Sequence, residues 1–175
     1  MADNLGGGVM DHYDALHAPK ALASVPRWKL DGRGQFRLQA PLMVDGIVRE
    51  GLYLLGRAPE STPGRDVAFM LCNGESKAKS IVIDRIDWKP TASHANRNIG
   101  PEDLRFLVID GSHRHVFDDN LTSTGELRSG NLPVARPLEE NLNTFGRLVA
   151  LAEVVYNIVS LGELAPPLWI EDLFG

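Results

Sequence analysis

The chain of 175 residues has a single cysteine, few aromatic residues and no long apolar run. One cysteine cannot form an internal disulfide or a zinc site built from thiolates. A membrane-spanning helix needs roughly 18 consecutive apolar residues, and no run approaches that length. The segment Met1-Ala2-Asp3-Asn4 is acidic and lacks the basic and then apolar order of a secretory signal. We therefore expect a cytoplasmic protein that does not insert into a membrane.

Positive charge is also in short supply. Lysine and arginine number 18 against 23 aspartates and glutamates, so the formal net charge is −5. Affinity for duplex nucleic acid comes mostly from neutralising phosphates, so this balance argues against a duplex partner. The rest of the composition, 43% apolar and 23% charged, is ordinary for a soluble globular protein.

Glycines mark a division near the N-terminus. Gly6-Gly7-Gly8 and Asp31-Gly32-Arg33-Gly34 flank a short alanine-rich stretch, and such glycines commonly act as flexible joints. We expect residues 1–34 to form a peripheral, partly flexible segment. Residues 35–175 are expected to form one domain, since this length is enough to bury a core.

The clearest strand pattern begins after residue 34. Apolar residues recur at every second position from Phe36 to Val44, which is typical of a half-buried strand. Pro41 cannot donate to a ladder, so this strand lies at an edge or contains a bulge. Asp45-Gly46 is a strong two-residue hairpin signal and predicts a return strand over 47–55. The expected pairs are Val44 with Ile47, Leu38 with Tyr53, and Phe36 with Leu55.

The later pattern changes from strands to a helix. Short apolar runs indicate strands over 67–72, 81–88, 104–109 and 113–117. Apolar residues then recur at spacings of three and four, with Pro137 at the first helical position and Glu139 and Glu140 in the first turn. This predicts an amphipathic helix over about 137–160. The fold expected is α+β: an antiparallel sheet of about six strands, two hairpins plus a meander, packed against one long C-terminal helix.

Three of the five histidines fall within residues 84–120. His113 and His115 alternate on an expected strand, so their imidazoles share one face, together with Phe117. His94 lies in a preceding loop. Two acidic residues accompany them: Asp87 on an earlier strand and Asp118 just after the histidine pair.

This set allows three kinds of chemistry. Two imidazoles on one face can bind a divalent metal such as zinc, with His94 or Asp118 as the third ligand and water at an open fourth position. Alternatively, His113, His115 and His94 with Asp87 act as acid and base on a phosphodiester without a metal. The third interpretation is structural, because a His-x-His pair on a strand is commonly solvent-facing or hydrogen-bonded.

Short motifs in this stretch also carry a resemblance. They are Arg85-Ile86-Asp87, His94-Ala95-Asn96 and His113-Arg114-His115-Val116-Phe117, with Tyr156-Asn157-Ile158 and Leu173-Phe174 further on. This pattern resembles a family of uncharacterised bacterial and phage-associated proteins, in which an Arg-Leu-Asp strand precedes His-x-Asn and then His-x-His with an aromatic residue. The gap between the two histidine motifs is longer here. No activity is known for that family, so the resemblance implies candidate residues and no function.

The C-terminal residues suggest a contact surface. Trp169 with Leu173 and Ile170 with Phe174 are spaced four apart, which predicts a short amphipathic turn. Such a turn can bind a groove on a partner protein. We prefer the alternative in which it docks on its own sheet or on a second copy. A homodimer through this tail or through the strand that contains Pro41 is the expected assembly.

Three functional interpretations stay open. A non-enzymatic binding or assembly module, of a prophage or toxin–antitoxin type, is slightly favoured by the acidic charge and the lack of a strong catalytic motif. The alternative is a metal-dependent or histidine-based hydrolase or phosphodiesterase. The third is a metal-binding protein without catalysis. An enzyme needs its imidazoles partly exposed in a concave pocket, so finding both His113 and His115 buried and bonded to the backbone would contradict it.

Overall fold

The structure, a computed structural model, describes residues 9–138 and 142–169. Its long strands are β3 (Gln35–Val44), β4 (Ile47–Pro59), β5 (Val67–Asn73) and β6 (Ile81–Trp88). Its short strands are β1 (Lys20–Leu22), β2 (Lys29–Leu30), β7 (His94–Ala95), β8 (Val108–Ile109), β9 (His113–His115), β10 (Arg136–Pro137) and β11 (Ile158–Val159). The α-helices are α1 (His12–His17) and α2 (Phe145–Tyr156). Single 3-10 turns are η1 (Lys77–Lys79), η2 (Glu102–Leu104), η3 (Asp118–Asn120) and η4 (Leu161–Glu163).

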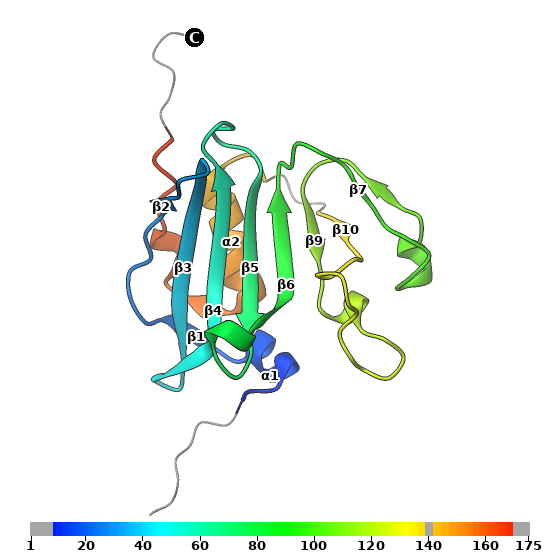
Figure 1. The fold of residues 1–175 in the computed structure, drawn as a ribbon, viewed down its shortest axis with the longest axis horizontal. Helices are drawn as coiled ribbons and strands as arrows, with labels where there is room; N and C mark the ends of the chain where they lie inside the picture. Colours follow the sequence, from blue (N-terminus) through cyan, green and yellow to red (C-terminus); the bar gives the residue numbers. More distant parts are fainter. Residues whose placement is uncertain (1–8, 139–141, 170–175) are drawn as a thin grey trace, which may run out of the picture.

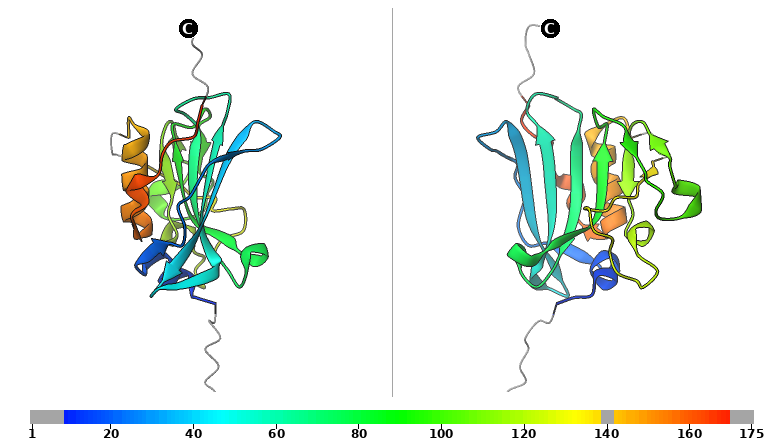
Figure 2. Two further views of the ribbon diagram at one scale, coloured as in Figure 1. Left: turned by 90° about the vertical axis from the view of Figure 1, so that its left-hand side faces the viewer. Right: turned by 45° about the vertical axis from the view of Figure 1, so that its right-hand side comes forward.

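Within the described ranges, nine strands form one sheet with the order β10-β9-β6-β5-β4-β3-β1-β11, and β2 pairs with β3. The pairs are antiparallel except for β1 with β11. Figure 1 shows α2 behind the sheet, and Figure 2 shows it stacked against one face. The α+β class is confirmed. The sheet has more strands than the six expected, because short edge segments extend it on both sides.

The β3–β4 hairpin is present, but its register differs from the expected one. Val44 faces Ile47, as predicted from the Asp45-Gly46 turn. Between Pro41 and Met43 the register shifts, and beyond that point Leu38 faces Gly56 and Phe36 faces Ala58. The expected pairs with Tyr53 and Leu55 were therefore wrong. Because β3 lies inside the sheet, Pro41 is accommodated by the irregularity rather than by an edge.

Helix α2 is shorter than the helix predicted over 137–160. The side chain of Thr144 accepts a hydrogen bond from the backbone N–H of Arg147, so the helix begins there. Asn157 takes the left-handed conformation, with φ 50° and ψ 52°, and ends it. Ile158–Val159 then pairs in parallel with β1. The residues expected to form the last helical turn thus belong to the sheet.

The residues expected to open the helix also lie elsewhere. Pro137 pairs with His113 in β10, and the N–H of Leu138 donates to the carbonyl of Ser112 at 3.1 Å. Pro137 has no N–H to donate, which an edge strand tolerates. Glu139 and Glu140 lie outside the described residues. The single long helix was therefore wrong at both ends.

Part of the N-terminal segment, expected at the periphery, belongs to the core. Helix α1 buries Ala15 and Leu16, and β1 lies between β3 and β11. Lys20 is 1% exposed. Its Nζ donates to the carbonyls of Ala15, Leu16 and Ala18 at 2.8, 2.9 and 2.7 Å. This ammonium satisfies carbonyls at the end of α1 that have no partner within the helix.

The hydrophobic core lies between the sheet and α2. Leu148, Ala152 and Tyr156 of the helix are fully buried, as are Phe69 and Ile86 of the sheet. The Tyr156 hydroxyl donates to the carbonyl of Phe69 at 3.1 Å, so its polar atom is satisfied within the core. Among the described residues, no helix has the length and hydropathy needed to cross a membrane.

Candidate metal centre

Strands β6 and β9 bring four candidate side chains to one face of the sheet. The antiparallel register places Asp87 opposite His113 and Arg85 opposite His115. Since side chains alternate along a strand, all four point the same way. Strand β9 ends at His115, before the expected end, and Phe117 packs in the hydrophobic core. The His-x-His spacing thus aligns the two imidazoles, and the neighbouring strand adds a carboxylate and a guanidinium.

His94 joins this group from β7. Its ring centre lies 5.2 Å from that of His113 and 4.8 Å from that of His115, and the last two are 5.2 Å apart. One ligand nitrogen from each ring lies within 4.8 Å of the other two. In the part of the chain that the structure describes, this is the only group of three or more side chains that could hold a metal ion.

Backbone carbonyls fix the tautomers of His113 and His115. Nδ1 of His113 lies 2.9 Å from the carbonyl oxygen of Gly111, and Nδ1 of His115 lies 2.6 Å from that of Leu132. A carbonyl oxygen only accepts, so Nδ1 of each neutral ring carries the hydrogen. In the neutral form of each ring, Nε2 is therefore the nitrogen that carries the lone pair. Metal-binding histidines are oriented by the same kind of contact.

Asn96 fixes the tautomer of His94. Its Nδ2 donates to the carbonyls of Leu104 and Ala135 at 2.8 and 2.7 Å, which identifies the other atom as the oxygen. That oxygen accepts from the N–H of Ala135 at 2.9 Å and lies 3.0 Å from Nε2 of His94. The carbonyl of Pro133 lies 3.3 Å from the same nitrogen. Nε2 of His94 is therefore the donor, and its Nδ1 carries the lone pair.

The cluster contains more acceptors than donors. Oδ2 of Asp87 lies 3.3 Å from Nε2 of His113 and 3.1 Å from Nε2 of His115. Arg85 donates from Nε to the same oxygen at 2.8 Å, and a terminal nitrogen of its guanidinium contacts Nε2 of His115. Among the described residues, no donor faces Nε2 of His113. Arg85 supplies one cation to this group, and a proton or a metal ion at Nε2 of His113 would supply the remaining partner.

The electrostatics keep two of the imidazoles neutral and the carboxylate ionised. Burial lowers the pKa of His94, and the charge of His113 lowers it further. Burial also lowers the pKa of His115, and the contact with the carboxylate of Asp87 opposes that shift. Burial by itself raises the pKa of Asp87, but its contacts with His113 and His115 and the charge of Arg85 hold that pKa well below its usual value. Neutral imidazole and ionised carboxylate are the forms that bind metals.

Residues 132–135 supply backbone groups that contact the histidine cluster. The backbone of one of them, Leu132, is strained. Leu132 has φ 60°, a left-handed conformation that costs about 1 kcal/mol or more in a residue of this type. This conformation accompanies a buried Leu132 side chain and a carbonyl aimed at His115. Asn120 fixes the neighbouring Val134, donating to its carbonyl and accepting from its N–H, both at 2.8 Å. Such strain concentrates at functional sites.

Both strand histidines are buried and bonded to the backbone. His113 is 3% exposed and His115 is not exposed at all. This outcome is contrary to what is expected of an enzyme that brings these imidazoles into contact with substrate. It does not argue against metal binding, because each ring keeps one nitrogen directed at the cluster. His94 is half-buried and is the member that faces a cavity.

Other candidate residues lie elsewhere. Asp118 is exposed in η3 and does not belong to the group of three histidines. Trp169 packs its ring against Phe36 at 6.4 Å, and its Nε1 donates to the carbonyl of Pro59 at 2.9 Å. The other tail residues singled out, Ile170, Leu173 and Phe174, lie outside the described ranges.

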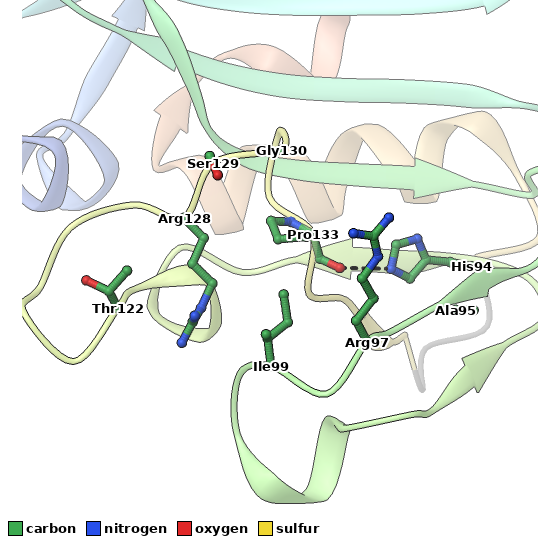
Figure 3. Close-up of a pocket in the computed structure, with 9 residues that line it drawn as sticks. All are labelled: His94, Ala95, Arg97, Ile99, Thr122, Arg128, Ser129, Gly130 and Pro133. Carbon is green, nitrogen blue, oxygen red and sulfur yellow. Dashed lines mark hydrogen bonds between the residues drawn. The ribbon is translucent and has the colours of Figure 1, made fainter.

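A cavity of about 590 Å³ opens beside His94. In Figure 3, His94 and Arg97 come from the segment that contains β7, whereas Arg128 and Pro133 come from the segment that follows η3. Neither arginine was predicted from the sequence, and Asn120 was not predicted to act near the site. No local motif marks them, because they act beside the cluster only once residues 121–135 fold back against β7.

Comparison of the chain with protein-family models, with curated proteins and with solved structures gives no match. The resemblance of the short histidine motifs to a family of uncharacterised proteins stays a prediction. The functional argument therefore rests on the geometry of the cluster and its cavity.

Proposed function

We propose that this chain binds one divalent transition-metal ion through His94, His113 and His115, with zinc as the first candidate. The observation that carries the proposal is the fixed tautomer of each ring. One nitrogen of every ring is hydrogen-bonded to a backbone carbonyl or to Asn96, and one ligand nitrogen of each ring lies within 4.8 Å of the other two. Imidazole suits zinc, copper, nickel and iron, whereas calcium and magnesium prefer oxygen ligands.

The spacing supports this assignment with a small adjustment. A tetrahedral ion about 2.1 Å from each nitrogen places the nitrogens about 3.4 Å apart. The ligand nitrogens lie within 4.8 Å of one another, so the most distant pair must approach by about 1.4 Å. Oδ2 of Asp87, already beside two of the nitrogens, offers a fourth ligand.

Metal-dependent hydrolysis is a second candidate, favoured by the cavity at His94. Three protein ligands with an open fourth position are the pattern of catalytic zinc sites. In this alternative, Asp87 stays with Arg85, and the cavity lined by His94 would give a substrate access to the ion. The metal-free acid–base alternative has less support, because His113 and His115 are buried and bonded to the backbone.

The assembly-module alternative has less support from the described residues. Trp169, the tail residue that could anchor a partner, packs against its own sheet at Phe36. The histidine cluster, in contrast, has a stated chemistry and a direct test. A homodimer stays a prediction.

Zinc binding to the untagged full-length chain tests the proposal. The protein is stripped with a chelator and titrated with zinc by calorimetry, and its metal content is then measured by elemental analysis. We expect one zinc per chain. His113→Ala and His94→Ala should each weaken zinc binding by at least about tenfold, because each removes one ligand. His17→Ala is the matched control, since His17 is exposed on α1 and outside the cluster.

The two variants protect the test against a folding defect. His113 is buried and its loss could unfold the chain, whereas His94 is half-buried in a short two-stranded pair. A circular dichroism spectrum identifies any unfolded variant. The proposal is wrong if the wild type binds no zinc, or if folded His94→Ala binds zinc as tightly as His17→Ala.

A further inference from the structure

The cavity beside the cluster contains two arginines without a counter-ion. Arg97 and Arg128 both line it, and no aspartate or glutamate does. Among the described residues, neither side chain makes a hydrogen bond or an ion pair; Arg97 is exposed, whereas Arg128 is half-buried and its Nε is buried without a partner. A buried guanidinium nitrogen without an acceptor is costly. An anion in the cavity would supply the missing acceptors.

Other arginines in this part of the molecule do have a counter-ion. Arg85, Arg114 and Arg136 each bind an aspartate, at 2.8, 2.8 and 2.6 Å. The fold thus provides a carboxylate for the arginines that hold its strands together. Arg97 and Arg128, which face the cavity, receive none. This difference identifies them as groups available to a ligand.

We propose that the cavity binds the phosphate group of a small phosphorylated molecule through Arg97 and Arg128. Two guanidinium groups match the two charges of a phosphate monoester better than the single charge of a carboxylate, and arginine donates to phosphate in a bidentate manner. A volume of about 590 Å³ lies within the range of small-molecule pockets. His94 lines the same cavity and belongs to the histidine cluster.

This inference rests on the proposed metal centre and names its ligand class. A metal held by His94, His113 and His115 would share His94 with the cavity that binds the phosphate. The charge of the metal would then add to that of the two arginines. We therefore expect zinc-loaded protein to bind phosphate more tightly than metal-free protein.

The experiment measures binding of phenyl phosphate and inorganic phosphate by calorimetry, in zinc-loaded wild type and in variants. We expect Arg97→Met and Arg128→Met each to weaken phenyl phosphate binding by at least tenfold. Arg65→Met is the matched control, because Arg65 is exposed and does not line the cavity. It should stay within twofold of the wild type. Phenylacetate, a monocarboxylate of similar shape, should bind at least tenfold more weakly than phenyl phosphate.

Each outcome has one meaning. Arginine-dependent binding with a preference for phosphate supports the inference. Absence of phosphate binding, equal binding by all arginine variants, or equally tight binding of phenylacetate would overturn it. Zinc binding is measured without phosphate, so failure of the metal centre is seen as zinc-free protein. Failure of the inference is seen as protein that holds zinc but lacks arginine-dependent phosphate binding.

Discussion

Strand β6 carries two aspartates whose surroundings differ. Asp84 faces the side of Arg114 and accepts from its Nε and a terminal nitrogen at 2.9 and 2.8 Å, and from the N–H of Phe117 at 3.2 Å. Every contact of this buried carboxylate is with a donor. Burial raises its pKa, and the bonds from Arg114 oppose that shift. Asp84 and Arg114 thus form an ion pair that links β6 to β9, which we call the closed pair.

Asp87, on the opposite face of the same strand, is in a different position. It has one donor side chain, Arg85, and its Oδ2 also lies 3.3 Å from Nε2 of His113 and 3.1 Å from Nε2 of His115. The two carboxylates lie on opposite faces of one strand. The hydrogen-bond contacts of Asp84 are all with donors, whereas the face that carries Asp87 has more acceptors than donors. Asp84 therefore belongs to a structural ion pair, whereas Asp87 belongs to a site that a bound cation would stabilise.

The largest expected effect comes from a substitution that breaks the closed pair. Arg114→Met leaves the Asp84 carboxylate buried without its partner, which typically costs about 3–5 kcal/mol. Urea unfolding of the metal-free protein measures this loss. Arg136→Met is the control, because Arg136 binds Asp119 in the same bidentate way with a side chain 45% exposed. Because Asp119 is buried but Arg136 is partly exposed, water can replace part of the lost guanidinium, and the loss should be smaller than for Arg114→Met.

The same variant tests whether the two faces are independent. A folded fraction of Arg114→Met should still bind one zinc, since Arg114 does not point toward the histidines. Zinc binding that disappears while the circular dichroism spectrum is retained would show that the two faces are coupled through β9.

The second prediction compares two asparagines with nearly the same contacts. Asn96 and Asn120 each donate to two carbonyls and accept one backbone N–H, but only Asn96 also contacts His94. Replacing either residue with alanine should destabilise the fold by about 2–3 kcal/mol, because buried backbone groups lose their partners. Only Asn96→Ala should also weaken zinc binding, by about tenfold, because His94 loses its orientation.

Calorimetry with zinc and urea unfolding, applied to both variants, give the two readouts. Equal zinc affinities in Asn96→Ala and Asn120→Ala would mean that the contact with His94 does not orient a ligand. The interpretation of Asn96 as a positioning residue would then be wrong.

The sequence predicted the local parts of this arrangement. The period of two on β3, the Asp45-Gly46 turn and the alternation of His113 and His115 all depend on neighbouring residues. The three histidines could therefore be selected as a group. The wrong elements depend on distant partners. The apolar period over 137–160 continues beyond Asn157, but pairing of Ile158–Val159 with β1 ends the helix.

Prediction of the site from the sequence is limited in the same way. The acceptors that fix His94 and His115 include the carbonyls of Pro133 and Leu132, which no side-chain pattern reveals. The arginines of the cavity come from two segments that meet only in the fold. Sequence reasoning selected the ligands, while the groups that orient them depend on long-range contacts.

The smallest expected effect concerns the donor that already lies in the cluster. Arg85 brings a positive charge to Asp87 and His115, so it competes with a metal cation for the same acceptors. Arg85→Met should therefore strengthen zinc binding, by about tenfold for a charge partly screened near the surface. It should also lower the stability of the metal-free protein, because Asp87 loses its donor. Zinc should restore that stability, since binding to the native state alone stabilises it.

Calorimetry and thermal unfolding with and without zinc separate these effects, and Arg65→Met controls for the change in net charge. If Arg85→Met binds zinc more weakly than Arg65→Met, Arg85 supports the centre by holding Asp87 in position rather than competing with the ion. The carboxylate would then be a zinc ligand that needs its guanidinium partner. The face of β6 that carries Asp87 would resemble the closed pair at Asp84 more closely than its acceptor-rich geometry indicates.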